Sequence, residues 1–176
     1  EDYTYRTAVT FLKPGVFSRY NDFKATVYAE QERPDTYRAR RVGAAAGFIY
    51  RPFDRWTVEA FGSLEASTID RTTVGDGDFL MASLPTTIRY DGSNSELDPT
   101  RGYRVSAGFE PFYEAVNGNF GLISDSTVSA YYPVGGERLV LAARASAGSI
   151  VGAPLQEIPA SRLFFAGGGG SIRGYD

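Results

Sequence analysis

Along several long stretches of this chain, apolar and polar residues alternate with a period of two. The stretch from residue 22 to residue 31 shows the pattern most clearly. One side of an extended chain there carries Phe23, Ala25, Val27 and Ala29, and the other side carries Lys24, Thr26, Tyr28 and Glu30. Because successive side chains of a β-strand point to opposite sides, this period indicates a strand with one apolar and one polar face.

The same pattern, with turn residues between its stretches, predicts about eight strands and no helix. The predicted strands cover residues 4–12, 22–31, 39–51, 56–69, 79–90, 103–113, 120–132 and 138–150. Most hold about 10–14 residues, whereas strands of globular proteins most often hold about 5–6 residues. A tilted strand that crosses a bilayer needs about 9–11 residues. Strand length therefore favours an all-β, antiparallel transmembrane β-barrel over a soluble β-sandwich with long hairpins.

Aromatic residues near the ends of the predicted strands agree with a membrane barrel. They are Tyr50, Phe53, Trp56, Phe79, Tyr90, Tyr103, Tyr113, Tyr131 and Tyr132. Membrane barrels carry girdles of aromatic side chains at both bilayer interfaces. We therefore expect lipid to surround the apolar face of the sheet.

The residue types that most often carry catalysis or bind metals are missing. The chain contains neither His nor Cys, which removes the commonest general base, the commonest metal ligand and every thiolate. Glu59 and Glu65 share one face of a predicted strand, but they are about 20 Å apart along it, which is too far for a glycosidase pair. The net charge of -3 argues against a nucleic-acid partner. We therefore expect no enzymatic activity, no cofactor and no nucleic acid.

A first motif lies in the turn over residues 91–102, with the sequence DGSNSELDPTRG. Its characteristic residues are Asp91, Asp98, Pro99, Arg101 and Gly102. Proline presets φ and glycine adopts backbone conformations that other residues avoid, so a tight, specific turn is expected. Calcium binding through Asp91, Glu96 and Asp98 is the alternative interpretation.

A second motif ends the chain over residues 164–176, with the sequence FFAGGGGSIRGYD. A glycine run that includes Gly167 and Gly168 precedes Arg173, Gly174 and Tyr175. Glycines leave the backbone free to adopt φ > 0, which suits a loop that enters a confined space. A flexible Gly-Ser linker is one alternative. A phosphate-binding loop is disfavoured because the Gly-Lys-Ser/Thr ending is absent.

Together, the two motifs resemble the outer-membrane protein assembly superfamily, which includes BamA, TamA and the two-partner secretion transporters. Residues 173–175 resemble the Arg-Gly-Phe or Arg-Gly-Tyr tripeptide of the family's sixth extracellular loop. Residues 98–102 resemble the family's Asn/Asp-Pro-Thr-Arg-Gly periplasmic turn, in the expected order along the chain. The Phe-Phe-Ala-Gly-Gly form and residues 158–161 look closest to TamA-like members.

This resemblance implies that residues 1–176 are the central part of a 16-stranded outer-membrane barrel. The part would hold about eight strands and the start of the sixth extracellular loop, without periplasmic domains or terminal strands. Loops at residues 32–35, 69–77 and 116–119 would face the cell exterior. Turns at residues 13–20, 52–55, 91–102 and 133–136 would face the periplasm.

The resemblance also implies a function in the Gram-negative outer membrane, namely the folding and insertion of other barrels or autotransporters. The implied partners are membrane lipid, nascent outer-membrane or autotransporter polypeptides, and a periplasm-spanning inner-membrane partner. A substrate strand would add to an open barrel edge at a lateral gate. The alternatives are a secretion pore that exports one partner polypeptide and a soluble β-sandwich binding module.

One residue of the second motif has an implied structural role. By the resemblance, Arg173 folds back inside the barrel. A guanidinium in that position needs carboxylate partners, because an unpaired buried charge is costly. Glu59, Glu65 and Glu110 lie on the polar faces of their predicted strands, so they are the candidate partners.

Overall fold

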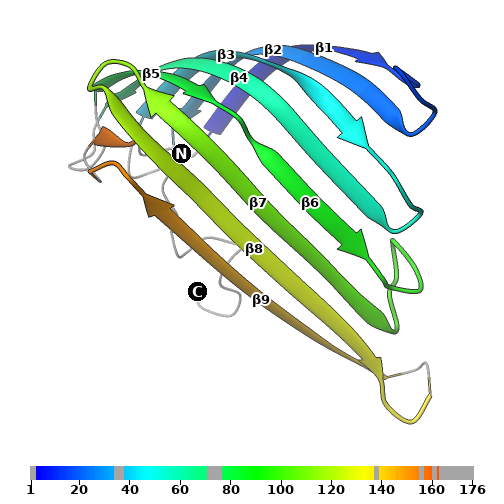
Figure 1. Ribbon diagram of the computed structural model, residues 1–176. Helices are drawn as coiled ribbons and strands as arrows, with labels where there is room; N and C mark the ends of the chain where they lie inside the picture. The colour runs from blue at the N-terminus through cyan, green and yellow to red at the C-terminus, as the bar shows by residue number, and fades with distance from the viewer. Residues whose placement is uncertain are drawn as a thin grey trace.

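Among the residues that the computed structural model describes, nine β-strands form one antiparallel, curved sheet (Figure 1). These residues are 3–33, 38–70, 77–136, 139–154, 157–159 and 162. The strands are β1 (Tyr3–Lys13), β2 (Asn21–Arg33), β3 (Arg38–Tyr50), β4 (Trp56–Asp70), β5 (Gly77–Ser83), β6 (Thr86–Asp91), β7 (Gly102–Glu114), β8 (Asn119–Pro133) and β9 (Val140–Val151). Apart from β5 and β6, every strand is long enough to cross a bilayer, so the predicted all-β architecture is confirmed.

Strands that are neighbours in the sheet are also neighbours in the sequence. The order is β1-β2-β3-β4-β5-β7-β8-β9, and β6 pairs with both β4 and β7. β5 and β6 therefore share one place between β4 and β7. The prediction of one continuous strand over residues 79–90 is wrong, because the chain leaves the ladder at Leu84 and Pro85. Pro85 has no N–H to donate, but its carbonyl oxygen accepts a hydrogen bond from the Phe61 amide at 2.9 Å.

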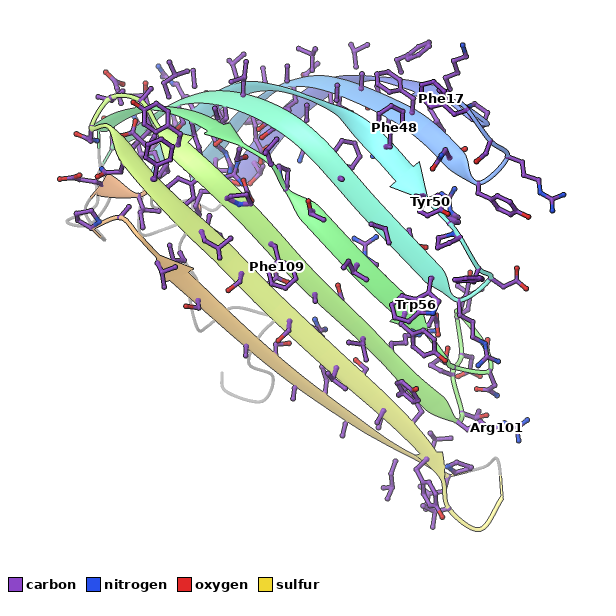
Figure 2. The ribbon with its side chains drawn as sticks, in the orientation of Figure 1. Phe17, Phe48, Tyr50, Trp56, Arg101 and Phe109 are labelled. Atoms are coloured by element: carbon purple, nitrogen blue, oxygen red, sulfur yellow. The ribbon has the colours of Figure 1, made fainter. Side chains whose placement is uncertain are left out.

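The two faces of the sheet differ in polarity, as the sequence alternation predicts. Residues that pair directly across strands share a face, and the register places Tyr28 of β2, Gly43 of β3 and Glu65 of β4 in one row. We call the face that carries this row the inner face. The outer face carries exposed apolar side chains, and Figure 2 shows two of them, Phe17 and Phe48, on the convex side of the sheet.

Aromatic side chains gather on the outer face at both ends of the strands. At the end near the 91–102 turn, the rings of Trp56 and Tyr90 lie 5.1 Å apart, and those of Tyr90 and Tyr103 lie 5.4 Å apart. At the opposite end, the rings of Tyr113 and Phe120 lie 4.5 Å apart. Two aromatic groups separated by the length of a strand match the expected interfacial girdles.

Candidate functional site on the inner face of the sheet

An apolar cluster on the inner face receives Ile158 from the segment after β9. Ile158 is 1% exposed and packs with Met81 of β5, Phe112 of β7 and Ile123 of β8. We call Met81, Phe112 and Ile123 the apolar socket. The Phe112 ring lies over Gly121, where a Cβ would be 2.4 Å from the ring. Full burial of an isoleucine side chain stabilises by about 1.5–3 kcal/mol, so the socket holds the segment firmly.

Four residues after Ile158, Arg162 pairs with two carboxylates of the same face. Its Nη1 lies 3.1 Å from Oε1 of Glu110 on β7, and its Nη2 lies 3.3 Å from Oε2 of Glu65 on β4. We call Glu65 and Glu110 the acidic pair, and Ile158 with Arg162 the anchor. A guanidinium suits this bridge because its N–H donors form a planar fork. One side chain thus connects β4 and β7, which lie on either side of the β5 and β6 position.

The carboxylates of the acidic pair are held in place by strand residues as well as by Arg162. The Tyr28 hydroxyl donates a hydrogen bond to Glu65 Oε2. The Ser83 hydroxyl donates to Glu110 Oε1 at 2.7 Å. Tyr28 reaches Glu65 by crossing over Gly43, where a Cβ would lie 2.7 Å from the tyrosine ring. Glycine at this position therefore leaves the space that the Tyr28 ring fills.

Burial and charge oppose each other at Arg162. Burial by itself lowers the pKa of the guanidinium, but the Glu65 and Glu110 carboxylates raise it by more, so the net shift of the pKa is upward. Arg162 therefore stays charged over the whole pH range in which the protein is folded. Within the described part of the chain, Glu65 Oε1 and Arg162 Nε have no hydrogen-bond partner. The ion pairs thus leave donor and acceptor capacity unused.

Other ion pairs connect neighbouring strands on the inner face. Arg41 of β3 pairs with Glu30 of β2 at 3.1 Å and also with Glu32. Glu59 of β4 pairs with Arg89 of β6 at 2.5 Å. Glu59 therefore has a partner of its own away from the anchor, whereas Glu65 and Glu110 share one.

The structure brings two of the three predicted carboxylates together, on an arginine that the sequence hypothesis did not name. Arg162 pairs with Glu65 and Glu110. The whole second motif, including Gly167, Gly168, Arg173, Gly174 and Tyr175, lies outside the described residues, so the role of Arg173 stays a prediction. A signal for the anchor was present in the sequence, since Arg162 is a lone charge between Ile158 and the apolar residues 163–166.

The turn over residues 91–102 is closed by its own side chains. Asn94 Oδ1 accepts hydrogen bonds from the amides of Thr100 and Arg101, both at 3.0 Å. Gly102 has φ +100°, and a Cβ there would lie 2.3 Å from a backbone carbonyl oxygen. Arg101 projects away from the sheet (Figure 2). These contacts support the interpretation of a specific turn.

Asp91 of this turn bonds to protein groups of its own. It pairs with Arg104 at 3.0 Å and accepts a hydrogen bond from the Ser93 amide at 2.9 Å. In the described ranges, no group of three or more His, Cys, Asp or Glu residues could hold a metal ion. The calcium interpretation of Asp91, Glu96 and Asp98 therefore has no support in the turn's geometry.

Comparison with known proteins decides the family. The Omp85 superfamily domain matches residues 1–176, which is the whole sequence. The chain belongs to the Omp85 superfamily. The protein is therefore an outer-membrane β-barrel protein of Gram-negative bacteria, and the soluble β-sandwich alternative is wrong. In the described residues, no helix is both long and apolar enough to span a bilayer.

A solved structure shows the same fold. The chain resembles BamA from Haemophilus ducreyi, crystallised without POTRA domains 1–3, with a TM-score of 0.80 and 15% sequence identity. The match covers 98% of this chain and 38% of that chain, so this sequence spans well under half the length of that BamA chain. A search of curated protein sequences gives no match.

Proposed function

We propose that this Omp85 chain is the central wall of a longer barrel that folds and inserts other β-barrel proteins into the outer membrane. Family membership and the BamA-like fold support the proposal. The observation that carries it is the anchor on the inner face, because Ile158 and Arg162 attach the segment that leads to the second motif to the barrel wall.

The anchor connects the two strands that flank an interruption in the wall. β5 ends at Ser83 and β6 begins at Thr86, so the ladder between β4 and β7 is interrupted there. Glu65 lies on one side of this break and Glu110 on the other, and Arg162 bridges them. A wall braced in this way keeps its curvature while another part of the barrel opens.

The insertion step itself would follow from the properties of strand edges. An open edge presents unpaired N–H and C=O groups, and a nascent strand gains hydrogen bonds by adding to it. We assign this step to a lateral gate in the complete barrel. The energy would come from folding of the substrate and burial of its apolar face in lipid, which needs neither nucleotide nor cofactor.

The finer identity that we propose is a TamA-like assembly factor. Its support is the form of residues 158–168, which joins the anchor to the Phe-Phe-Ala-Gly-Gly sequence. Autotransporter polypeptides would then be the substrates, and a periplasm-spanning inner-membrane protein would be the partner. Lipid would surround the apolar outer face.

Reconstitution in lipid vesicles tests the proposal. The complete protein would be compared with its Arg162→Gln variant and with a matched control, Asp22→Asn, which breaks a different inner-face ion pair, to Arg51. An unfolded autotransporter barrel is added outside, and its protease-resistant fraction is measured. We expect insertion by the complete protein, severalfold slower insertion by Arg162→Gln, and a normal rate for Asp22→Asn.

Two results would contradict the proposal. Equal insertion in vesicles with and without the complete protein would refute the assembly function. Accumulation of the substrate inside the vesicle lumen, instead of in the bilayer, would favour the secretion-pore alternative.

A further inference from the structure

The anchor and its binding site come from different parts of the chain. The apolar socket and the acidic pair belong to β4, β5, β7 and β8. Ile158 and Arg162 belong to the segment that follows β9. The arrangement has the form of a receptor on the wall and a short peptide ligand that is tethered to it.

The receptor is built from residues of the strands alone. Strand pairing places Ser83 opposite Phe112, and Glu110 opposite Ile123. Residues of the socket and of the acidic pair therefore lie in the same or in neighbouring rows of the sheet. The Tyr28 and Ser83 hydroxyls, which belong to strands of the wall, donate hydrogen bonds to the two carboxylates. A site of this kind binds without a large ordering cost.

The receptor is also incompletely satisfied by its tethered ligand. Glu65 is 4% exposed, yet its Oε1 has no hydrogen-bond partner within the described ranges. Arg162 Nε is likewise buried without a partner among those residues. Unpaired buried polar atoms weaken an interaction, so a peptide that supplies one more donor would compete well with Ile158 and Arg162.

We propose that the inner wall is a peptide-binding site that Ile158 and Arg162 of the same chain occupy as a tethered competitor. Its ligand is an extended polypeptide with a branched apolar residue four positions before an arginine. The apolar side chain enters the socket of Met81, Phe112 and Ile123, and the guanidinium bridges Glu65 and Glu110. That such a segment comes from an assembly substrate rests on the proposed function, whereas the binding site itself does not.

Lysine should be a poor substitute for arginine in this ligand. An ammonium group is a compact charge that cannot offer a planar fork to two carboxylates on different strands. The site therefore distinguishes arginine from lysine, which bulk electrostatic attraction does not. This difference separates a built site from general attraction of cationic peptides to an acidic surface.

Fluorescence anisotropy with labelled peptides tests the proposal on the complete protein in detergent micelles. The probe is a capped peptide with the sequence EIPASR, and the controls replace its arginine by lysine or its isoleucine by serine. Releasing the tethered ligand with Ile158→Ser and Arg162→Gln should raise probe affinity about tenfold or more, because an intramolecular competitor acts at millimolar effective concentration.

Variants of the receptor show where the probe binds. Adding Glu65→Gln and Glu110→Gln to the released protein should abolish binding, whereas adding Asp22→Asn should leave it unchanged. Circular dichroism of every variant checks that the barrel is folded, and the single Arg162→Gln variant replaces the double variant if the latter fails to fold.

Specific results would overturn the proposal. They are equal probe affinity for the wild-type and released proteins, equal affinity for the arginine and lysine peptides, or binding that survives the loss of Glu65 and Glu110. Such a failure leaves vesicle insertion intact and so does not refute the proposed function. Conversely, specific peptide binding by a protein that inserts nothing would refute the proposed function and retain this site.

Discussion

Replacing Arg162 by glutamine should destabilise the barrel by about 2–3 kcal/mol, as a free energy of unfolding. The variant removes the cation that pairs with Glu65 among the described residues, and the Glu65 side chain is only 4% exposed. Removing one partner of a fully buried ion pair costs about 3–5 kcal/mol. We expect less than that range because the Arg162 and Glu110 side chains are 23% and 16% exposed, so water screens part of the loss.

Equilibrium urea unfolding of the complete protein in micelles, followed by circular dichroism, measures this change. Double-mutant cycles, in which Arg162→Gln is combined with Glu65→Gln or with Glu110→Gln, then show how much of the lost stability comes from each ion pair. We expect coupling energies of about 1–2 kcal/mol for each pair, as for residues in direct contact. Asp22→Asn, which has no contact with the anchor, should be additive with Arg162→Gln.

Two outcomes would refute this reasoning. A loss of less than about 0.5 kcal/mol in Arg162→Gln would show that the ion pairs contribute no more than exposed ones do. A full loss without coupling to Glu65 or Glu110 would show that Arg162 acts through contacts other than the acidic pair.

Three further predictions concern two glycines and one arginine. Gly43→Ala should destabilise the barrel by about 1–3 kcal/mol in the same urea assay, because the added Cβ would lie 2.7 Å from the Tyr28 ring. The control Gly62→Ala should be neutral, because the atom nearest to its added Cβ is 3.9 Å away. Gly102→Ala should lower the yield of folded barrel on gels, because φ of Gly102 is +100° and the added Cβ would lie 2.3 Å from a backbone carbonyl oxygen. An unchanged yield would contradict this prediction. Arg173→Ala should reduce insertion activity or thermal stability with little change in strand content by circular dichroism, and unchanged values of both would refute a bracing role for that arginine.

Local sequence pattern was sufficient for the faces of the strands. The alternation over residues 22–31 and 56–69 predicted which side chains of each strand share a side. The register then places Tyr28 and Glu65 in one row. Side-chain direction in a strand depends only on the parity of the residue number, which is why a single segment carries this information. The interruption at Pro85 was missed because the apolar and aromatic residues on both sides of it read as one strand.

Pairing partners, by contrast, were not available from the pattern. Glu59 and Glu65 have the same parity on the same strand, yet Glu59 pairs with Arg89 and Glu65 with Arg162. Which arginine a carboxylate meets depends on the register of neighbouring strands and on where the segment after β9 crosses the sheet. Neither property is encoded in the alternation of one strand.

The sequence by itself thus determined an all-β barrel wall, its two faces and its family, because strand periodicity and short motifs are local properties. Only the tertiary structure decided that Arg162, 97 residues from Glu65 in the chain, bridges it to Glu110. It also decided that Ile158 fills a socket made by three strands. The physical reason is that a buried charge or apolar group finds its lowest free energy among the neighbours that folding provides, and sequence distance does not specify those neighbours.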